Sequence, residues 1–405
     1  MTCVGHLYIQ TNENQNRVIH YLRGDDGTLK EADRHATGGS GCGNFNYRAT
    51  PLAIVIDGAQ GVLLAPDHGF LFAVNACDNS ISSFRVGDDG TLELLDVKRT
   101  GNVVTGRTGT AKSLAYSPST QTLYVLHASG PDHIRMMSVD SEGMLSPRLE
   151  SYTAVPPEKP GRLTTMLMLS PDERFLLVGC SLDELPAANP DGSPIIWVQR
   201  NGRPHSIFAN APDPDGLAVF PVEEDGTLGE PMFQDAGAGS PWCPLFLNQR
   251  PDHFILGFAT ADGLSLARLG SDGRVATGPV VQADTSIGRG SGLCWMAITP
   301  DDNLVFATMT GYGYITSWHL EGNAPSVAKD PACAKVRGDG TFRGLGGIVG
   351  AAPNDMWITP DGAYLYQMYP NASKLIGYNV QPDGSLVEVS SADIPHNSPF
   401  GLAGF

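Results

Sequence analysis

Short apolar stretches separated by turn residues recur along the whole chain. Residues 70–75, 175–179 and 364–367 are examples, and each is rich in aromatic, β-branched or leucine side chains. Stretches of this length, bounded by glycine, proline and aspartate, are typical of β-strands. We therefore expect an all-β protein built from many short strands.

A proline followed by aspartate, or once by serine, separates two such stretches at six places. Proline presets φ for the first central position of a type I turn, and aspartate suits the next position. Each occurrence predicts a reversal between two antiparallel strands. The six are Ala65-Pro66-Asp67, Ser117-Pro118-Ser119, Ser170-Pro171-Asp172, Arg250-Pro251-Asp252, Thr299-Pro300-Asp301 and Thr359-Pro360-Asp361.

A second turn signal, Asp-Gly or the related Glu-Gly, follows later in the same units. Asp-Gly between alternating hydrophobic residues is the strongest short hairpin signal in a sequence. It predicts that two further strands are joined there. The occurrences are Asp26-Gly27, Asp89-Gly90, Glu142-Gly143, Asp225-Gly226, Asp272-Gly273 and Asp383-Gly384.

The two signals together define a repeating unit of four antiparallel strands, which we call A, B, C and D in chain order. Such a repeat predicts a β-propeller, and counting both signals gives seven blades. The first unit lacks its proline turn, because residues 7–10 already fit strand B; we expect residues 398–405 to supply its strand A and close the ring. In the sixth unit, strand C at residues 315–320 runs into Glu321-Gly322-Asn323 without an Asp-Gly turn. The whole chain, residues 1–405, is then one domain.

Extra length lies in three insertions, at about residues 38–60, 181–210 and 323–355. In a propeller the A–B and C–D turns lie on one side of the disc, the turn face, and the B–C and D–A connections lie on the other, the loop face. All three insertions belong to the loop face, where they could cover the central funnel as a lid. Apolar runs such as Ile195-Ile196-Trp197 favour a packed lid, although loop length also drifts without a function.

Charge and composition exclude several classes of function. The chain has 26 basic and 43 acidic residues, a net charge of −17, which disfavours binding to nucleic acid or to an anionic membrane. No apolar run reaches the roughly 18 residues of a membrane span, so we expect a soluble protein, cytoplasmic or secreted with its leader removed. Seven cysteines without a CxxC spacing predict neither a metal site nor a cofactor.

Candidate acid, base and polarising groups come from the strand A entries and the B–C loops, which we expect to line the funnel. His127, His396 and Asp355 are the candidates for proton transfer. Arg162 and Arg289 could polarise a carbonyl group through their forked donors. The alternative for each is a surface position or a structural hydrogen bond.

Candidate substrate-binding residues are mostly aromatic, which predicts a small apolar or ring-bearing organic ligand. Core packing between blades is the competing interpretation for the aromatic side chains, and small buried cysteines are common in strand A. The candidates are Arg48, Tyr47, Trp242, Cys243, Trp295, Tyr312, Tyr314, Trp197 and Asn75, and Lys112 is a further residue at a strand A entry.

Two motifs carry a resemblance to a known family. The turn Ser170-Pro171-Asp172-Glu173-Arg174-Phe175-Leu176 and the segment Cys294-Trp295-Met296-Ala297-Ile298-Thr299-Pro300-Asp301 resemble those of the lactonase-type seven-bladed propellers. That family includes the propeller 6-phosphogluconolactonases and the fungal carboxy-muconate lactonizing enzyme. The resemblance implies a lactone-converting enzyme, but Thr165 and Leu245 stand where the family pattern implies a histidine and an arginine.

Three functions follow as hypotheses. The resemblance implies hydrolysis or cycloisomerisation of a lactone in a lidded central funnel. The missing histidine and arginine, together with the aromatic candidates, also suit a cyclase of terpenoid or polyketide biosynthesis that acts through orientation and hydrogen bonding, for example in a pericyclic cycloaddition. A non-catalytic interaction scaffold is the third. The sequence predicts no oligomeric state.

Overall fold

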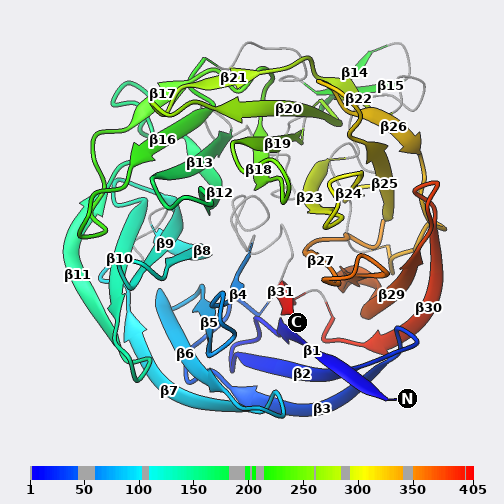
Figure 1. The fold of residues 1–405 in the computed structure, drawn as a ribbon, viewed down its shortest axis with the longest axis horizontal. Helices are drawn as coiled ribbons and strands as arrows, with labels where there is room; N and C mark the ends of the chain where they lie inside the picture. Colours follow the sequence, from blue (N-terminus) through cyan, green and yellow to red (C-terminus); the bar gives the residue numbers. More distant parts are fainter. Residues whose placement is uncertain are drawn as a thin grey trace.

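The computed structural model describes the chain except residues 1, 44–59, 103–108, 182–196, 201–202, 207–213, 260, 284–291, 341–349 and 397. Its strands form seven antiparallel blades arranged in a ring, with strand A of each blade innermost and strand D at the rim (Figure 1). The predicted all-β, seven-bladed propeller is thereby confirmed.

The first four blades follow one another along the first half of the chain. Blade 1 consists of β31 (Phe400–Gly404), β1 (Cys3–Gln10), β2 (Arg17–Gly24) and β3 (Leu29–Ala36). Blade 2 consists of β4 (Val62–Leu64), β5 (Phe70–Asn75), β6 (Ser80–Val86) and β7 (Leu92–Arg99). Blade 3 consists of β8 (Gly109–Ser117), β9 (Thr122–Ser129), β10 (Ile134–Val139) and β11 (Leu145–Tyr152). Blade 4 consists of β12 (Leu163–Leu169), β13 (Phe175–Ser181), β16 (Leu217–Pro221) and β17 (Met232–Gln234).

The remaining three blades complete the ring. Blade 5 consists of β18 (Pro241–Phe246), β19 (His253–Phe258), β20 (Gly263–Leu269) and β21 (Val275–Thr277), and the short β22 (Val281–Gln282) also pairs with β20. Blade 6 consists of β23 (Leu293–Ile298), β24 (Leu304–Met309), β25 (Tyr314–His319) and β26 (Ser326–Lys329). Blade 7 consists of β27 (Met356–Ile358), β28 (Tyr364–Tyr369), β29 (Lys374–Val380) and β30 (Leu386–Asp393), with the 3-10 helix η2 (Pro370–Ala372) between β28 and β29.

Both turn signals lie where the sequence predicts them. In the A–B turn of blade 7, an aspartate caps the reversal: the Thr359 hydroxyl donates to Asp361 Oδ1 at 2.5 Å, and the backbone N–H of Ala363 donates to the same oxygen at 3.0 Å. In the C–D turns, glycine takes a positive φ, as at Gly27 with φ 78°, which a side chain would strain. Blade 6, where Asp-Gly is missing, uses Gly322 with φ 74°.

The ring closes by pairing the two ends of the chain, as predicted. Strand β31 pairs antiparallel with β1, with Tyr8 opposite Ala403. The backbone N–H of His6 donates to the Phe405 carbonyl at 2.8 Å, and the guanidinium of Arg23 donates to the same oxygen. Each inner strand also contacts the inner strand of the next blade all the way round. The pairing covers the inner edge of β1 and ties the C-terminal strand into blade 1.

The core lies between blades, because strands B and C bury side chains on both faces of each sheet. One cluster, for example, joins Leu7 and Tyr21 of blade 1 to Tyr366 and Leu375 of blade 7. Strand D is mostly exposed, as β3 shows. Within the described residues, no helix is long and apolar enough to cross a membrane.

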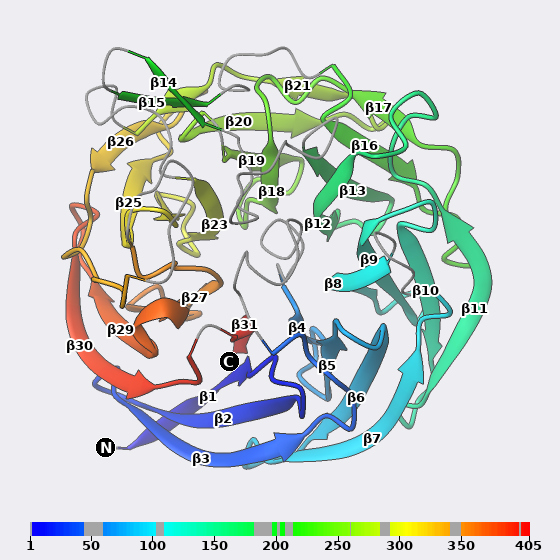
Figure 2. The same ribbon diagram turned by 180° about the vertical axis from the view of Figure 1, so that it is seen from behind.

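One feature within the predicted insertions is a hairpin of β14 (Trp197–Arg200) and β15 (Arg203–Ser206), which forms a separate two-stranded sheet at the edge of the disc (Figure 2). It belongs to the long B–C connection of blade 4. Much of the three insertions lies outside the described residues, so the lid and the assignment of the chain to a single domain stay predictions.

Candidate functional site

A cavity of about 260 Å³ lies at the centre of the ring among the inner strands. Its lining extends from residues at the start of these strands, such as Asp355, to residues at their ends, such as Ile298 and Ile358. The described cavity therefore reaches from the loop-face end of the inner strands toward the turn face. The lining residues are Gln60, Met166, Cys243, Leu245, Phe246, Asn248, Trp295, Met296, Ala297, Ile298, Asp355, Met356, Trp357, Ile358 and Leu402.

Asp355 is the one carboxylic acid among the described residues that line this cavity. It precedes β27 and is only 4% exposed. Oδ1 accepts the backbone N–H of Gln60 at 3.0 Å, and Oδ2 accepts that of Gly401 at 2.9 Å. Burial raises the pKa of Asp355 to about 6, although these N–H groups and the Lys112 charge oppose the rise. A carboxylate with this pKa can accept a proton near neutral pH.

Gly401 makes the contact with Asp355 possible. Its φ is 73°, in the left-handed region, and a Cβ there would collide with the backbone of Val62. Blades 1, 2 and 7 thus meet at one carboxylate, since Gly401 belongs to β31, Gln60 precedes β4 and Asp355 precedes β27. The sequence supports this convergence through a glycine that permits the close approach.

Lys112 brings a buried positive charge to the same region. It lies in β8, is 1% exposed, and donates from Nζ to the Thr164 carbonyl at 3.2 Å. Its Nζ lies 5.3 Å from the centroid of the Trp242 ring, a cation–π distance. The positive charge of Lys112 favours the ionised forms of Asp355 and Cys294. It therefore partly offsets the rise in the pKa of each group that burial causes.

Two tryptophans form an aromatic wall beside these charges. The rings of Trp242 and Trp295 meet edge to face, with centroids 5.8 Å apart and an interplanar angle of 66°. Both indole N–H groups are buried, and neither has a hydrogen-bond acceptor among the described residues. A buried donor without an acceptor is unusual and suits a bound ligand. Trp295 lines the cavity.

The two cysteines of this region are poor nucleophiles. Cys243 lines the cavity, and Cys294 lies one residue before Trp295. Burial raises the pKa of Cys243 far above its usual value and that of Cys294 to about 12, so both stay protonated at neutral pH. Their thiols act as small apolar groups here.

His127 and Arg162 occupy structural positions away from the cavity lining. His127 lies inside β9 and not in a loop; it is fully buried, with Nε2 2.9 Å from Thr100 Oγ1. Burial lowers its pKa to about 3, which leaves the ring neutral. The Arg162 guanidinium pairs with Asp215 at 2.6 Å and donates to the Cys180 carbonyl at 3.0 Å.

Asn75, Tyr312 and Tyr314 also lie outside the cavity lining. Asn75 ends β5 and is part of a buried network, with Oδ1 accepting from Asn16 at 2.9 Å. The rings of Tyr312 and Tyr314 lie 6.0 Å apart, and Lys335 Nζ is 4.8 Å and 5.7 Å from their respective centroids. The structure therefore places the two tyrosines against a lysine.

The remaining predicted residues lie elsewhere. His396 is on the connection between β30 and β31, where it contacts Ser373 and Asp339. Tyr47, Arg48 and Arg289 lie outside the described residues, and for Trp197 only the backbone, in β14, is described. Of the predicted set, Asp355, Cys243 and Trp295 line one cavity, and Trp242 adjoins it.

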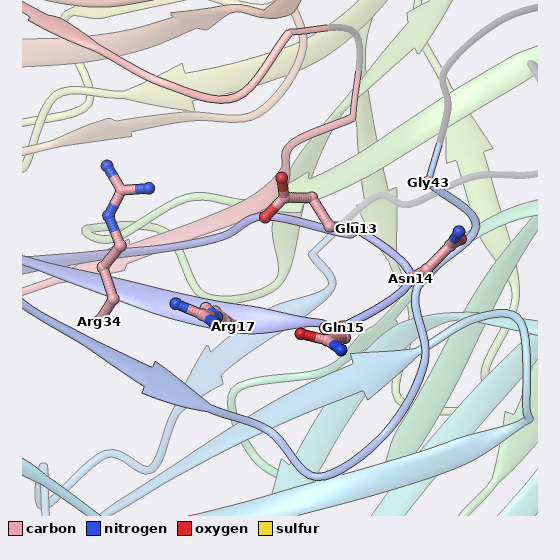
Figure 3. Close-up of a pocket in the computed structure, with 6 residues that line it drawn as sticks. All are labelled: Glu13, Asn14, Gln15, Arg17, Arg34 and Gly43. Carbon is pink, nitrogen blue, oxygen red and sulfur yellow. The ribbon is translucent and has the colours of Figure 1, made fainter.

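A second hollow, of about 550 Å³, lies at the connection between β1 and β2 (Figure 3). Arg34, in this hollow, pairs with Glu31 at 2.7 Å. The labelled side chains are spread along the groove and do not converge on one point. The central cavity, with its buried carboxylate, is the better candidate site. The residues of the second hollow are Glu13, Asn14, Gln15, Arg17, Arg34 and Gly43.

Comparison with known proteins agrees with the architecture. No family model matches the chain. The 6-phosphogluconolactonase of Erwinia tasmaniensis is 25% identical over 297 residues, which cover 69% of this chain and 83% of that protein. The 6-phosphogluconolactonase of Yersinia pestis strain Pestoides F is 24% identical over 297 residues, which cover 68% of this chain and 83% of that protein. The chain is thus similar in sequence to two proteins named 6-phosphogluconolactonase over about two thirds of its length.

Solved structures show the same fold over the full length of this chain. The periplasmic gluconolactonase PpgL of Pseudomonas aeruginosa superposes with a TM-score of 0.66 and 14% identity, covering 99% of this chain and 98% of that one. A protein from Lactobacillus plantarum superposes with a TM-score of 0.68 and 13% identity over both entire chains. At these identities, the structural likeness establishes the fold alone.

Part of the site could not be predicted from the sequence. Gln60 contributes through its backbone N–H, which leaves no signature in the residue type. The unpartnered indole N–H groups also follow only from packing. Lys112 did carry a signal, because a lysine stands among small and apolar residues in Thr110-Ala111-Lys112-Ser113-Leu114, inside an inner strand.

Proposed function

We propose that this protein hydrolyses a small lactone in the central cavity, with Asp355 as the general base. The observation that carries the proposal is the buried Asp355 carboxylate, whose pKa of about 6 suits proton transfer at neutral pH. The sequence similarity to proteins named 6-phosphogluconolactonase supports the lactone as substrate class.

The chemistry is an acyl transfer to water. The Asp355 carboxylate takes a proton from a water molecule as the water oxygen attacks the lactone carbonyl carbon. The Trp295 indole N–H donates a hydrogen bond to the carbonyl oxygen as it becomes negative, and the buried Lys112 charge favours the same anion. The ring C–O bond then breaks, and the protonated Asp355 returns its proton to the leaving alkoxide, giving an open hydroxy acid.

The substrate we propose is apolar and monocyclic, and it does not carry a phosphate. Most of the lining is apolar, including Met166, Phe246 and Leu402. Among the described residues, the lining contains no arginine or lysine that could bind a phosphate directly. A cavity of about 260 Å³ also lies just below the usual range for drug-sized ligands, which suits a small ring.

The test compares two buried aspartates. Asp355→Asn keeps the size of the side chain and removes the base, so we expect kcat/KM on the best of a panel of aliphatic and aryl lactones to fall at least about 100-fold. The matched control is Asp302→Asn, because Asp302 is also buried and accepts two backbone N–H groups, those of Asn248 and Gln249, but does not line the cavity. Acid release is followed with a pH indicator.

Two outcomes would contradict this proposal. Equal loss of activity in Asp302→Asn and Asp355→Asn would mean that both carboxylates act through stability alone. No acid release from any lactone by the folded protein would instead favour the non-catalytic scaffold.

A cyclase remains the second candidate, favoured by the apolar lining and by the Trp242–Trp295 wall. A reaction that depends on orientation needs no general base. For a cyclase, Asp355→Asn would leave turnover of a polyene or diene substrate nearly unchanged, whereas Trp295→Ala would lower it. The two variants therefore separate hydrolysis from cyclisation.

A further inference from the structure

Three connections on the loop face bring a serine, a histidine and an aspartate into one hydrogen-bonded row. Ser373 follows η2 in the B–C loop of blade 7, Asp339 lies between β26 and β27, and His396 follows β30. Ser373 Oγ lies 2.8 Å from His396 Nδ1, and His396 Nε2 lies 2.9 Å from Asp339 Oδ2. None of the three lines the central cavity.

The acceptor at Asp339 decides which histidine nitrogen carries the hydrogen. An ionised carboxylate can only accept, so in neutral His396 the hydrogen sits on Nε2 and is donated to Asp339. Nδ1 is then bare and accepts the Ser373 hydroxyl hydrogen. This is the arrangement in which a histidine acts as the base for a serine nucleophile.

Asp339 is held in place by a buried neighbour. Asn371 is fully buried, and its Nδ2 donates to Asp339 Oδ1 at 2.9 Å. The backbone N–H of Asp339 donates in turn to Asn371 Oδ1 at 3.2 Å. One carboxylate oxygen therefore binds the amide and the other binds the imidazole, which fixes the orientation of the histidine ring.

Ser373 sits on a constrained backbone. Its φ is 55° and its ψ is 38°, a left-handed conformation that is costly for a residue with a side chain. The turn holds it there, since the Ser373 N–H donates to the Pro370 carbonyl at 3.0 Å and its own carbonyl accepts from Ile394 at 3.1 Å. The serine hydroxyl is thus presented at a fixed point of a tight turn.

The row is open to solvent. The side chains of His396 and Asp339 are 45% and 38% exposed, so a small molecule can reach them without any opening of the ring. Two neighbouring charges are already engaged, because Lys374 Nζ pairs with Asp393 at 2.6 Å. The site differs in this respect from the buried Asp355 in the centre.

We propose that Ser373, His396 and Asp339 form a second acyl-transfer site, which cleaves small activated carboxylic esters at the loop face through a covalent intermediate. Ser373 Oγ forms a bond to the ester carbonyl carbon while its proton passes to His396 Nδ1. The ester C–O bond then breaks, and His396 gives that proton to the leaving alcohol. The oxygen of a water molecule, deprotonated by His396, then bonds to the acyl carbon; the bond from that carbon to Ser373 Oγ breaks, and His396 returns the proton to Oγ as the acid leaves.

Labelling with a fluorophosphonate tests the proposal without depending on lactone turnover. The reagent forms a phosphorus–oxygen bond to an activated serine and expels fluoride, and intact-protein and peptide mass spectrometry locate the adduct. We expect one adduct, on Ser373, lost in Ser373→Ala and slowed at least about 100-fold in His396→Gln. Asp339→Asn should slow labelling and shift its pH profile, because the amide favours the wrong imidazole tautomer.

Two controls keep the outcome decisive. Ser385→Ala removes a serine whose hydroxyl donates to Asp383 at 2.6 Å, a similar pair without a histidine, and should leave labelling unchanged. Asp355→Asn should also label at the normal rate, which separates this site from the cavity. Absence of an adduct on the folded protein, or equal labelling of His396→Gln, would overturn the proposal.

Discussion

The seven cysteines show how strongly position within the ring changes the chemistry of one residue type. All seven are described, and none is joined in a disulfide. Cys243 and Cys294 are buried in inner strands, where desolvation raises their pKa values. Cys77 is exposed two residues after β5, and its backbone N–H donates to the Ser40 carbonyl at 3.0 Å. A side-chain hydrogen bond with Cys42 lowers the pKa of Cys77 to about 6.

We therefore expect Cys77 to be the fastest-reacting thiol among these seven. At pH 7 most of it is thiolate, so iodoacetamide should modify it about tenfold faster than the other exposed cysteine, Cys3. Peptide mass spectrometry over a time course measures the rates. Cys42→Ala removes the hydrogen-bond partner and should slow Cys77 toward the rate of Cys3, while Cys3→Ala should leave it unchanged. Equal rates for Cys3 and Cys77 in the parent protein would contradict the assignment of the hydrogen bond.

At the scale of the strands and turns, the repeat in the sequence predicted most of the fold. Each turn signal is local, since proline or glycine is needed at one φ value, and a local requirement can be recognised in a single residue type. The C-terminal strand β31 could be assigned to blade 1 because blade 1 lacked a strand A. The β14–β15 hairpin was not predicted, since nothing in its sequence repeats elsewhere.

The candidate site was only partly predictable, because many of its contacts join segments that lie far apart in the chain. Asp355, Cys243 and Trp295, which were chosen because they lie at the start of strand A, line the cavity, because an inner strand faces the centre of the ring. The expectation that His127 lies in a B–C loop was wrong, since β9 continues to Ser129 and the ring is fully buried. The row of Ser373 and its partners depends on three separate connections, and no spacing along the chain records their proximity.

Two turn glycines offer a matched test of the turn assignment. Gly27 and Gly322 close C–D turns with φ values of 78° and 74°. Open space surrounds Gly322, whereas a Cβ at Gly27 would collide with the ring of Tyr364 in the next blade. Gly322→Ala should cost about 1–2 kcal/mol from φ strain alone, and Gly27→Ala about 1–3 kcal/mol more. Urea unfolding gives both free energies. Equal losses of stability in the two variants would mean that Gly27 of blade 1 does not pack against Tyr364 of blade 7.

For the whole molecule, ring closure joins residues from the two ends of the chain at one seam. His6 and His20 lie there, with His6 Nδ1 2.8 Å from His20 Nε2 and the His6 ring 5.0 Å from the Phe405 ring. Both are buried, and burial lowers the pKa of His6 and brings that of His20 to about 4. Asp89 and Asp33 partly oppose this, while Arg23 and His35 reinforce it.

Two more buried histidines lie in blade 3, where burial lowers the pKa of His127 to about 3 and that of His133 to about 4. All four histidines therefore hold fewer protons in the native state than in the unfolded chain, where their pKa is about 6.5. Their contribution to stability is complete above pH 6.5 and is lost as the pH falls toward 4. Asp355 works in the opposite direction, because its native pKa is raised to about 6.

The four buried histidines lose stability as the pH falls, and only Asp355 among the groups considered gains it. We therefore expect the free energy of unfolding to decrease from pH 7 to pH 4.5. The slope is at most about 1.4 kcal/mol per pH unit for each histidine. Urea unfolding at half-unit pH steps measures it. His20→Gln removes one titrating group from the seam and should flatten the curve between pH 6.5 and 4.5, whatever its effect at pH 7. His253→Gln, at a partly exposed histidine paired with Asp252, is the control and should leave the shape unchanged. A parent protein that is equally stable at pH 7 and pH 4.5 would show that the seam histidines are not buried in neutral form.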